Sequence, residues 1–166
     1  MALTPAQLTT LKAYILADPV LAPLTSGPTT DLVALQNALN ADASPVQKAW
    51  RHLPANEVFA AMDSGEIDNI TSGAKQWAIG TIMPAQGGIN ATTAAGRKAI
   101  TDLFANASVP LTRAAVLAAA TENASVAEVA LGGSSASSAS PNVVTALVRN
   151  WSGDLSLQDV REVLGL

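Results

Sequence analysis

The sequence predicts an all-α fold of about eight short helices in a compact bundle, with a flexible serine-rich stretch and a short C-terminal helix. Three observations predict this class. Serine or threonine comes directly before proline where an apolar periodicity begins, as at a helix N-terminus. Alanine is abundant, and alanine favours helix. No alternation of apolar and polar residues continues far enough to indicate a substantial sheet.

The composition indicates a protein that binds other proteins. The chain has 166 residues, which suits one domain, or one domain with an appendage. Hydrophobic residues make up 49% of it and charged residues only 13%, against a usual charged share of about 25%. Because so little of the surface can be charged, much of it is free for protein contacts, as in an assembly component.

The N-terminal third predicts two helices. Thr4 followed by Pro5 marks the first helix start. Its apolar face is formed by Leu8, Leu11, Ile15 and Leu16. Residues 17–28 contain three prolines and a glycine, so they predict an irregular segment. A second helix is expected from Asp31 to about Asn40, with leucines on its inner face.

The middle of the chain predicts further short helices. Ser44-Pro45 repeats the first start signal and predicts a helix that Pro54 interrupts. A helical piece that carries Val58 and Met62 on its inner face is expected to follow. The next helix is expected over about 68–79, with Ile70, Ala74 and Trp77 facing inward.

Residues 83–100 raise the question of a phosphate-binding loop. Such a loop needs G-x-x-x-x-G-K-[ST] after a buried strand, but Gly96 is followed by Arg97, Lys98 and an alanine. The simpler interpretation is a Gly-Gly hinge and a helix over about 91–105 that Asn90 caps. Gly96 then lies inside the helix, where a neighbouring group packs close.

The remaining helix signals define three parts of the chain. Pro110 starts one helix, and the S-x-x-E and S-x-x-D patterns that begin at Ser125 and Ser156 start two more. The predicted division is a helical domain over 1–131, a Ser/Gly-rich linker or arm over 132–142, and a C-terminal helical segment over 143–166.

No catalytic, cofactor-binding or metal-binding residue is predicted. His52, the single histidine, has no nominated nucleophile or orienting group and is interpreted as a half-exposed residue at a helix end. The acids Asp63, Glu66 and Asp68 do not match a calcium-loop spacing and are interpreted as a solvated turn near a helix N-terminus. An enzyme is therefore the least favoured class.

Charge and hydropathy also argue against several kinds of partner. The net charge is −4 and the basic residues are scattered, so direct nucleic-acid binding is not expected. The longest wholly apolar run, residues 114–120, is too short to cross a bilayer. No cysteine and no secretory signal are present, so synthesis in a cytoplasm is expected.

Four segments of the chain resemble a group of small structural proteins of tailed bacteriophages. They are LTPAQLTTLKAYILADPVLAPL at the start, ASPVQKAWRHLPANEVFAAMD, INATTAAGRKAITDLF, and TRAAVLAA at 112–119. In that group, these landmarks are a T-P helix start, a Trp-Arg pair, an asparagine followed seven residues later by arginine, and a T-R-A-A segment. The serine-rich stretch and the tail depart from the pattern.

The resemblance implies a non-enzymatic virion protein, made in the host cytoplasm. It implies a neck or head-to-tail connector subunit that assembles in a ring and contacts portal, stopper or tail proteins. The alternatives are a minor tail- or capsid-associated protein, or a small helical regulatory or binding module. Candidate protein-contact residues are Leu16, Val20, Leu21, Arg97, Lys98, Trp151, Leu164 and Leu166.

Overall fold

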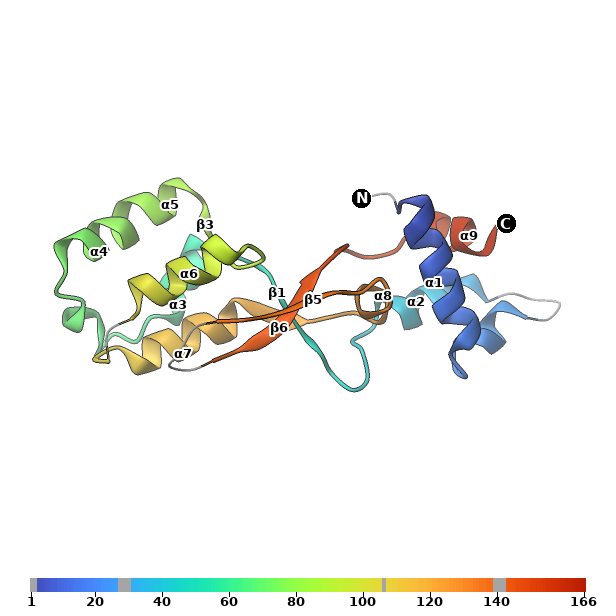
Figure 1. Ribbon diagram of the computed structural model, residues 1–166, viewed down its shortest axis with the longest axis horizontal. Helices are drawn as coiled ribbons and strands as arrows, with labels where there is room; N and C mark the ends of the chain where they lie inside the picture. Colours follow the sequence, from blue (N-terminus) through green and yellow to red (C-terminus); the bar gives the residue numbers. More distant parts are fainter. Residues whose placement is uncertain (1–2, 27–30, 106, 139–142) are drawn as a thin grey trace. The chain divides into compact units, whose positions relative to one another are not determined.

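A computed structural model describes residues 3–26, 31–105, 107–138 and 143–166. They form helices, a four-stranded mixed sheet and a two-stranded sheet (Figure 1). The fold is therefore mixed α and β, and the all-α prediction is wrong. Residues 139–142 of the predicted linker lie outside the described residues.

The chain is divided into two compact units, each built from separate stretches of sequence. Unit 1 consists of residues 1–47, 123–134 and 149–166, and unit 2 consists of residues 48–122 and 135–148. The chain thus passes from one unit to the other four times. The division along the sequence at 131 and 142 differs from this arrangement, because both units combine early and late segments.

Unit 1 contains helices that begin where the sequence indicates. They are α1 (Pro5–Ala17), the 3₁₀ turn η1 (Ala22–Thr25), α2 (Leu32–Asn40), α8 (Val126–Ala130) and α9 (Leu157–Leu164). Thr4, Ser125 and Ser156 each form a capping box at the start of α1, α8 and α9. These three predicted starts are confirmed, because a capping box uses only residues within one turn of each other.

The core of unit 1 joins these helices. Its buried residues are Leu3, Leu11, Ile15, Leu21, Leu35, Leu39, Ala127, Leu131, Trp151, Leu155, Val160 and Val163. The backbone of Leu155 is fixed to α2, since its carbonyl accepts from Gln36 (2.8 Å) and Asn40 (2.9 Å). Arg149 donates to the buried Glu128 at 2.8 Å, which also completes the capping box of α8.

Six short strands occur in the described residues. They are β1 (Lys48–Trp50), β2 (His52–Pro54), β3 (Gly88–Asn90), β4 (Thr121–Asn123), β5 (Gly133–Ser137) and β6 (Thr145–Arg149). The larger sheet has the order β4-β1-β6-β5, with Ala49 opposite Leu147 in the parallel pair of β1 and β6. Strands β2 and β3 are antiparallel, with Leu53 opposite Ile89.

The helix predicted after Ser44-Pro45 is replaced by β1 and β2. The residues on either side of β1 bond to residues far along the chain: Ala124 donates its N–H to the Gln47 carbonyl at 2.8 Å, and the Arg51 N–H donates to the Ala120 carbonyl at 3.0 Å. Strands of three residues are too short to show an apolar alternation. Pairing with distant strands therefore determines the structure of this segment, and the local sequence pattern does not identify those strands.

Unit 2 contains the remaining helices. They are α3 (Ala55–Ala61), the 3₁₀ turn η2 (Ile67–Asn69), α4 (Gly73–Trp77), the π-helical turn η3 (Ala78–Ile82), α5 (Met83–Ala85), α6 (Ala94–Leu103) and α7 (Pro110–Ala119). Elements α4, η3 and α5 follow one another without a break, and we call residues 73–85 the α4–α5 run (Figure 1).

The N-cap of α6 differs from the prediction. Thr93 caps it by accepting from the Gly96 N–H at 3.0 Å. Asn90 instead ends β3, and its side-chain oxygen accepts from the Thr92 N–H at 3.1 Å. The pairing of β3 with β2 holds Asn90 in the sheet, so the next suitable hydroxyl takes the cap position.

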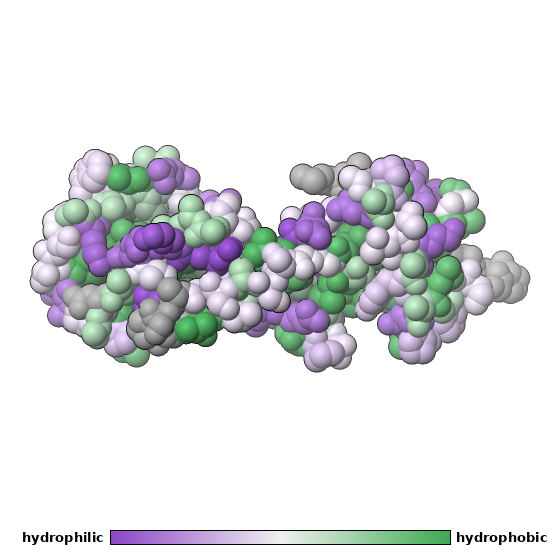
Figure 2. Space-filling view, in the orientation of Figure 1, coloured by the Kyte–Doolittle hydropathy of each residue, from purple (hydrophilic) through white to green (hydrophobic). Residues whose placement is uncertain are grey.

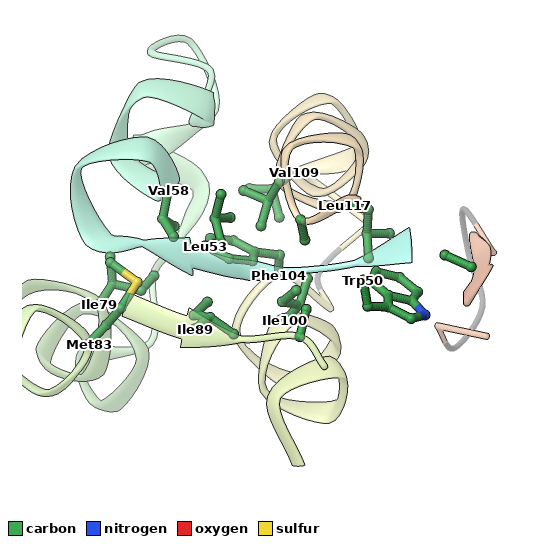
Figure 3. Close-up of a cluster of buried hydrophobic side chains, with 14 of the residues drawn as sticks. Trp50, Leu53, Val58, Ile79, Met83, Ile89, Ile100, Phe104, Val109 and Leu117 are labelled. Carbon is green, nitrogen blue, oxygen red and sulfur yellow. The ribbon is translucent and has the colours of Figure 1, made fainter. Parts of the chain in front are cut away.

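The core of unit 2 is larger than that of unit 1 and includes the two-stranded sheet (Figure 3). Its buried residues are Trp50, Leu53, Val58, Ile70, Ile79, Met83, Ile89, Ala91, Ile100, Phe104, Val109, Val116, Leu117, Ala120 and Ala146. Trp50 is 1% exposed, and its indole N–H donates to the Ala136 carbonyl at 2.9 Å. The core and this hydrogen bond therefore connect β1 to the helices of unit 2 and to β5.

Candidate functional site

The predicted contact residues of unit 1 separate into buried and exposed groups. Leu21 and Trp151 are each 4% exposed and belong to the core of the unit. Leu16, Val20 and Leu166 are 55%, 72% and 72% exposed. Leu164 is half-buried, and its carbonyl accepts from Lys12 at 2.9 Å. The surface of unit 1 therefore offers Leu16, Val20 and Leu166, but not Leu21 or Trp151.

Arg97 and Lys98 are occupied within unit 2. Arg97 donates to the carbonyls of Ala91 (2.9 Å) and Thr92 (3.0 Å), and so holds the loop between β3 and α6. Its guanidinium also lies over the Trp50 ring, 5.8 Å from the ring centroid. Lys98 forms an exposed ion pair with Asp102 at 2.5 Å, one helical turn away. Arg97 positions the loop, and only Lys98 presents its charge at the surface.

His52 does not lie at a helix end. It is exposed on β2, and its Nε2 lies 3.2 Å from the carbonyl of Gly87. The interpretation as a helix-end histidine is corrected, because the predicted helix around it is a strand.

The acidic turn caps a helix through one buried carboxylate. Glu66 is 8% exposed and accepts from the N–H groups of Leu111 (3.0 Å) and Thr112 (2.7 Å) in the first turn of α7. Burial alone would raise the pKa of Glu66, but the bonds from Thr112 and Leu111 outweigh it and lower that pKa. The predicted acids at a helix N-terminus are present, yet the helix is α7 and Glu66 is not solvated.

We predict that Glu66→Gln makes the free energy of unfolding less dependent on pH in the acid range. The folded-state pKa of Glu66 lies below its ordinary value of 4.5. The ionised form therefore stabilises the fold above the unfolded-state pKa, and this contribution is lost as pH falls through the folded-state pKa. Urea midpoints of both proteins should differ most near neutral pH and converge toward pH 3. Asp68→Asn is the matched control, and a Glu66→Gln difference that is constant with pH would contradict the assignment.

A groove in the surface of unit 2 is the candidate functional site, and we call it the apolar groove. It has a volume of about 510 Å³, within the usual range for binding sites. Its lining residues are Phe59, Met62, Ile67, Asp68, Ile70, Gln76, Ile79 and Gly80. They come from α3, from the turn around η2 and from the α4–α5 run, so the groove joins three segments that the sequence separates.

Two features of the α4–α5 run shape this groove. Ile79 and Gly80 lie in the π-helical turn η3, a rare geometry that occurs frequently at functional sites. An added Cβ at Gly80 would meet no atom within 4 Å. The fold therefore does not need glycine there, although glycine in a helix costs about 1 kcal/mol relative to alanine. Gly80 lines the groove, and a side chain at this position would extend into open space.

Large apolar side chains are exposed at and beside the groove. Phe59 and Ile67 are each 44% exposed, and Trp77 on α4 is 60% exposed. Trp77 was predicted to face inward with Ile70, but only Ile70 is buried. Apolar side chains reach the surface of both units, among hydrophilic ones (Figure 2). Phe59 lies off the apolar face of α3, and an aromatic residue in such a position is the sequence signal that could have indicated this site.

The polar groups of the groove favour a cationic ligand. Gln76 is occupied, since its amide donates to the Ile70 carbonyl at 2.7 Å. The exposed carboxylate of Asp68 makes no hydrogen bond or ion pair within the described residues. An apolar group that carries a positive charge beside it would satisfy both the lining and Asp68.

A second hollow lies where the α4–α5 run meets β3 and α6. Its volume is about 480 Å³, and it is lined by Ile82 and Met83 of the run, by Ile89 of β3, and by Ala99 and Leu103 of α6, among others. The run therefore contributes residues to two hollows. Its buried anchors are Ile79 and Met83.

Among the described residues, no group of three or more His, Cys, Asp or Glu side chains could hold a metal ion. In the same part of the chain, no helix has both the length and the hydropathy needed to cross a bilayer. No protein family, curated protein or solved structure matches the chain.

Proposed function

We propose that the chain is a non-enzymatic structural protein of a tailed-phage virion, a neck or head-to-tail connector subunit that assembles in a ring. Its partners would be further copies of itself and portal, stopper or tail proteins. It would be made in the host cytoplasm and reside in the virion. The observation that carries the proposal is the resemblance of four segments to small phage structural proteins.

The landmark residues of that resemblance that lie in unit 2 have structural roles, which supports a kinship of fold rather than of chemistry. Trp50 fills the core and Arg97 lies over its ring. Arg113 of the T-R-A-A segment is 1% exposed and donates to the Thr101 carbonyl near the C-terminal end of α6, at 3.4 Å. Burial lowers the pKa of Arg113. Buried residues of this kind determine how a subunit folds, whereas its surface residues determine which partners it binds.

The surface chemistry supports an assembly role in a second way. Only 13% of the residues are charged, and large apolar side chains are exposed on both units. Exposed apolar residues that gather around a groove indicate contact with another protein. The apolar groove also suits the alternative function, a small regulatory or binding module that receives a peptide.

Purified virions test the proposal most directly. Mass spectrometry of particles from the phage that encodes this chain should detect the protein at a constant copy number per particle. Immunogold labelling should place it between head and tail. A protein that is abundant in infected cells but absent from mature particles would contradict the virion role and favour the regulatory module. Labelling on the tail or capsid would favour a minor structural protein there.

A further inference from the structure

The apolar groove is open on unit 2 and has one uncompensated charge, that of Asp68. A surface of the chain itself can complement both the groove and this charge. The occupant must present an exposed apolar side chain next to a cation that has no partner of its own. Most described cations fail this requirement because they are already engaged: Lys12, Lys48, Arg51, Arg97, Lys98, Arg113 and Arg149. Lys75 and Arg161 remain.

Of these two cations, Arg161 lies beside an exposed leucine. Arg161 is exposed on α9 and makes no side-chain hydrogen bond or ion pair within the described residues. Leu157 precedes it by one helical turn and is 39% exposed. Residues four apart lie on the same face of a helix. Val160 and Val163 of α9 point into the core of unit 1, so Leu157 and Arg161 form the outward face of this helix.

We propose that a second copy of the chain docks the outward face of its α9 into the apolar groove. Leu157 of one copy enters between Phe59, Ile67 and Ile79 of the next, and Arg161 pairs with Asp68. The groove of about 510 Å³ has room for a leucine side chain together with the aliphatic stem of an arginine. This inference deepens the self-association in the proposed function and rests on that part of it.

The contact joins two different surfaces, so more than one kind of assembly can be built from it. The donor, α9, belongs to unit 1, and the acceptor groove belongs to unit 2. A contact between unlike surfaces is heterologous, so each added copy leaves one groove and one α9 free. Such an interface closes into a ring when the rotation between copies permits closure, and otherwise extends as a filament. Two copies that exchange the contact reciprocally would instead close as a symmetric dimer.

Charge reversal in the full chain tests the pairing. Sedimentation velocity should show concentration-dependent association of the wild-type protein. Asp68→Lys and Arg161→Glu should each weaken association about tenfold or more, since each places like charges in contact. The chain that carries both changes should recover wild-type association, as should an equimolar mixture of the two single variants. Failure of both to recover would overturn the pairing.

Filling the groove supplies a second test that does not alter charge. Gly80→Leu places a side chain in open space, so the variant should keep the wild-type circular dichroism spectrum and lose association. Gly80→Ala is the matched control and should associate nearly as the wild type does. A Gly80→Leu protein that associates normally, or a wild-type protein that stays monomeric at the highest accessible concentration, would overturn the proposal.

The outcomes for the contact and for the virion role can be told apart. If the protein is monomeric but is found in virions, the proposed contact is contradicted and the virion role is not. A protein that forms charge-dependent assemblies but is absent from virions would keep the contact and remove the role.

Discussion

Gly96→Ala is expected to destabilise unit 2 by about 3 kcal/mol or more, the upper range for forcing extra atoms into a packed site. A Cβ at position 96 would lie 1.8 Å from the carbonyl oxygen of Asn90 and 3.2 Å from the nitrogen of Ala91. Both are backbone atoms of the loop that enters α6, so no side chain can rotate away. Either the loop or the first turn of α6 must move.

Gly80→Ala is the matched control for this prediction. It makes the same chemical change in a helical segment of the same unit, but the new methyl group meets no atom within 4 Å. Stability should rise by up to about 1 kcal/mol, because alanine favours helix over glycine. Urea unfolding followed by circular dichroism measures both variants. Equal effects of the two substitutions would show that the close approach at Gly96 does not exist.

Trp50→Ala is expected to cost about 3–5 kcal/mol, as for other large aromatic residues removed from a core. Trp50 is 1% exposed, contributes its ring to the core of unit 2 and supports the guanidinium of Arg97. The substitution leaves a cavity beside β1 and removes the donor to Ala136. Hydrogen exchange measured by mass spectrometry should show lost protection in residues 94–103 and 110–119.

Trp50→Phe separates the hydrogen bond from the packing. Phenylalanine retains most of the apolar area but cannot donate to the Ala136 carbonyl, which costs about 1–2 kcal/mol. The core segments of unit 1, such as residues 157–164, serve as an internal reference for exchange. A Trp50→Phe protein as unstable as Trp50→Ala would mean that the indole N–H, and not the ring, carries the stabilisation.

Trp50 and Arg113, which contribute to the core of unit 2, are also landmark residues of the phage resemblance. Variants at Trp50, Gly96 or Arg113 would disturb assembly only by unfolding the subunit. Variants at Asp68, Gly80 and Arg161 change exposed positions instead. Assembly defects from this second group, in chains with an unchanged Tm, would therefore report on the contact itself.

The sequence by itself determined the features that depend on neighbouring residues. The capping boxes at Thr4, Ser125 and Ser156 are closed by residues three positions away, so the starts of α1, α8 and α9 could be predicted correctly. Pro110 at the first position of α7 is a signal of the same kind. The prediction that a group packs close to Gly96 is also confirmed, because an added Cβ there would lie 1.8 Å from the carbonyl oxygen of Asn90.

Only the tertiary structure decided the sheets, the two units and the groove. Strand β1 pairs with β6 and β4 across long stretches of chain, and a strand of three residues has no periodicity of its own to predict it. For the same reason, the sequence could not tell that Leu21 and Trp151 are buried while Trp77 is exposed. The apolar groove exists because α3, η2 and the α4–α5 run meet without filling the space beside Gly80. Local signals set where helices begin, whereas contacts between distant residues set which faces are buried and which remain open.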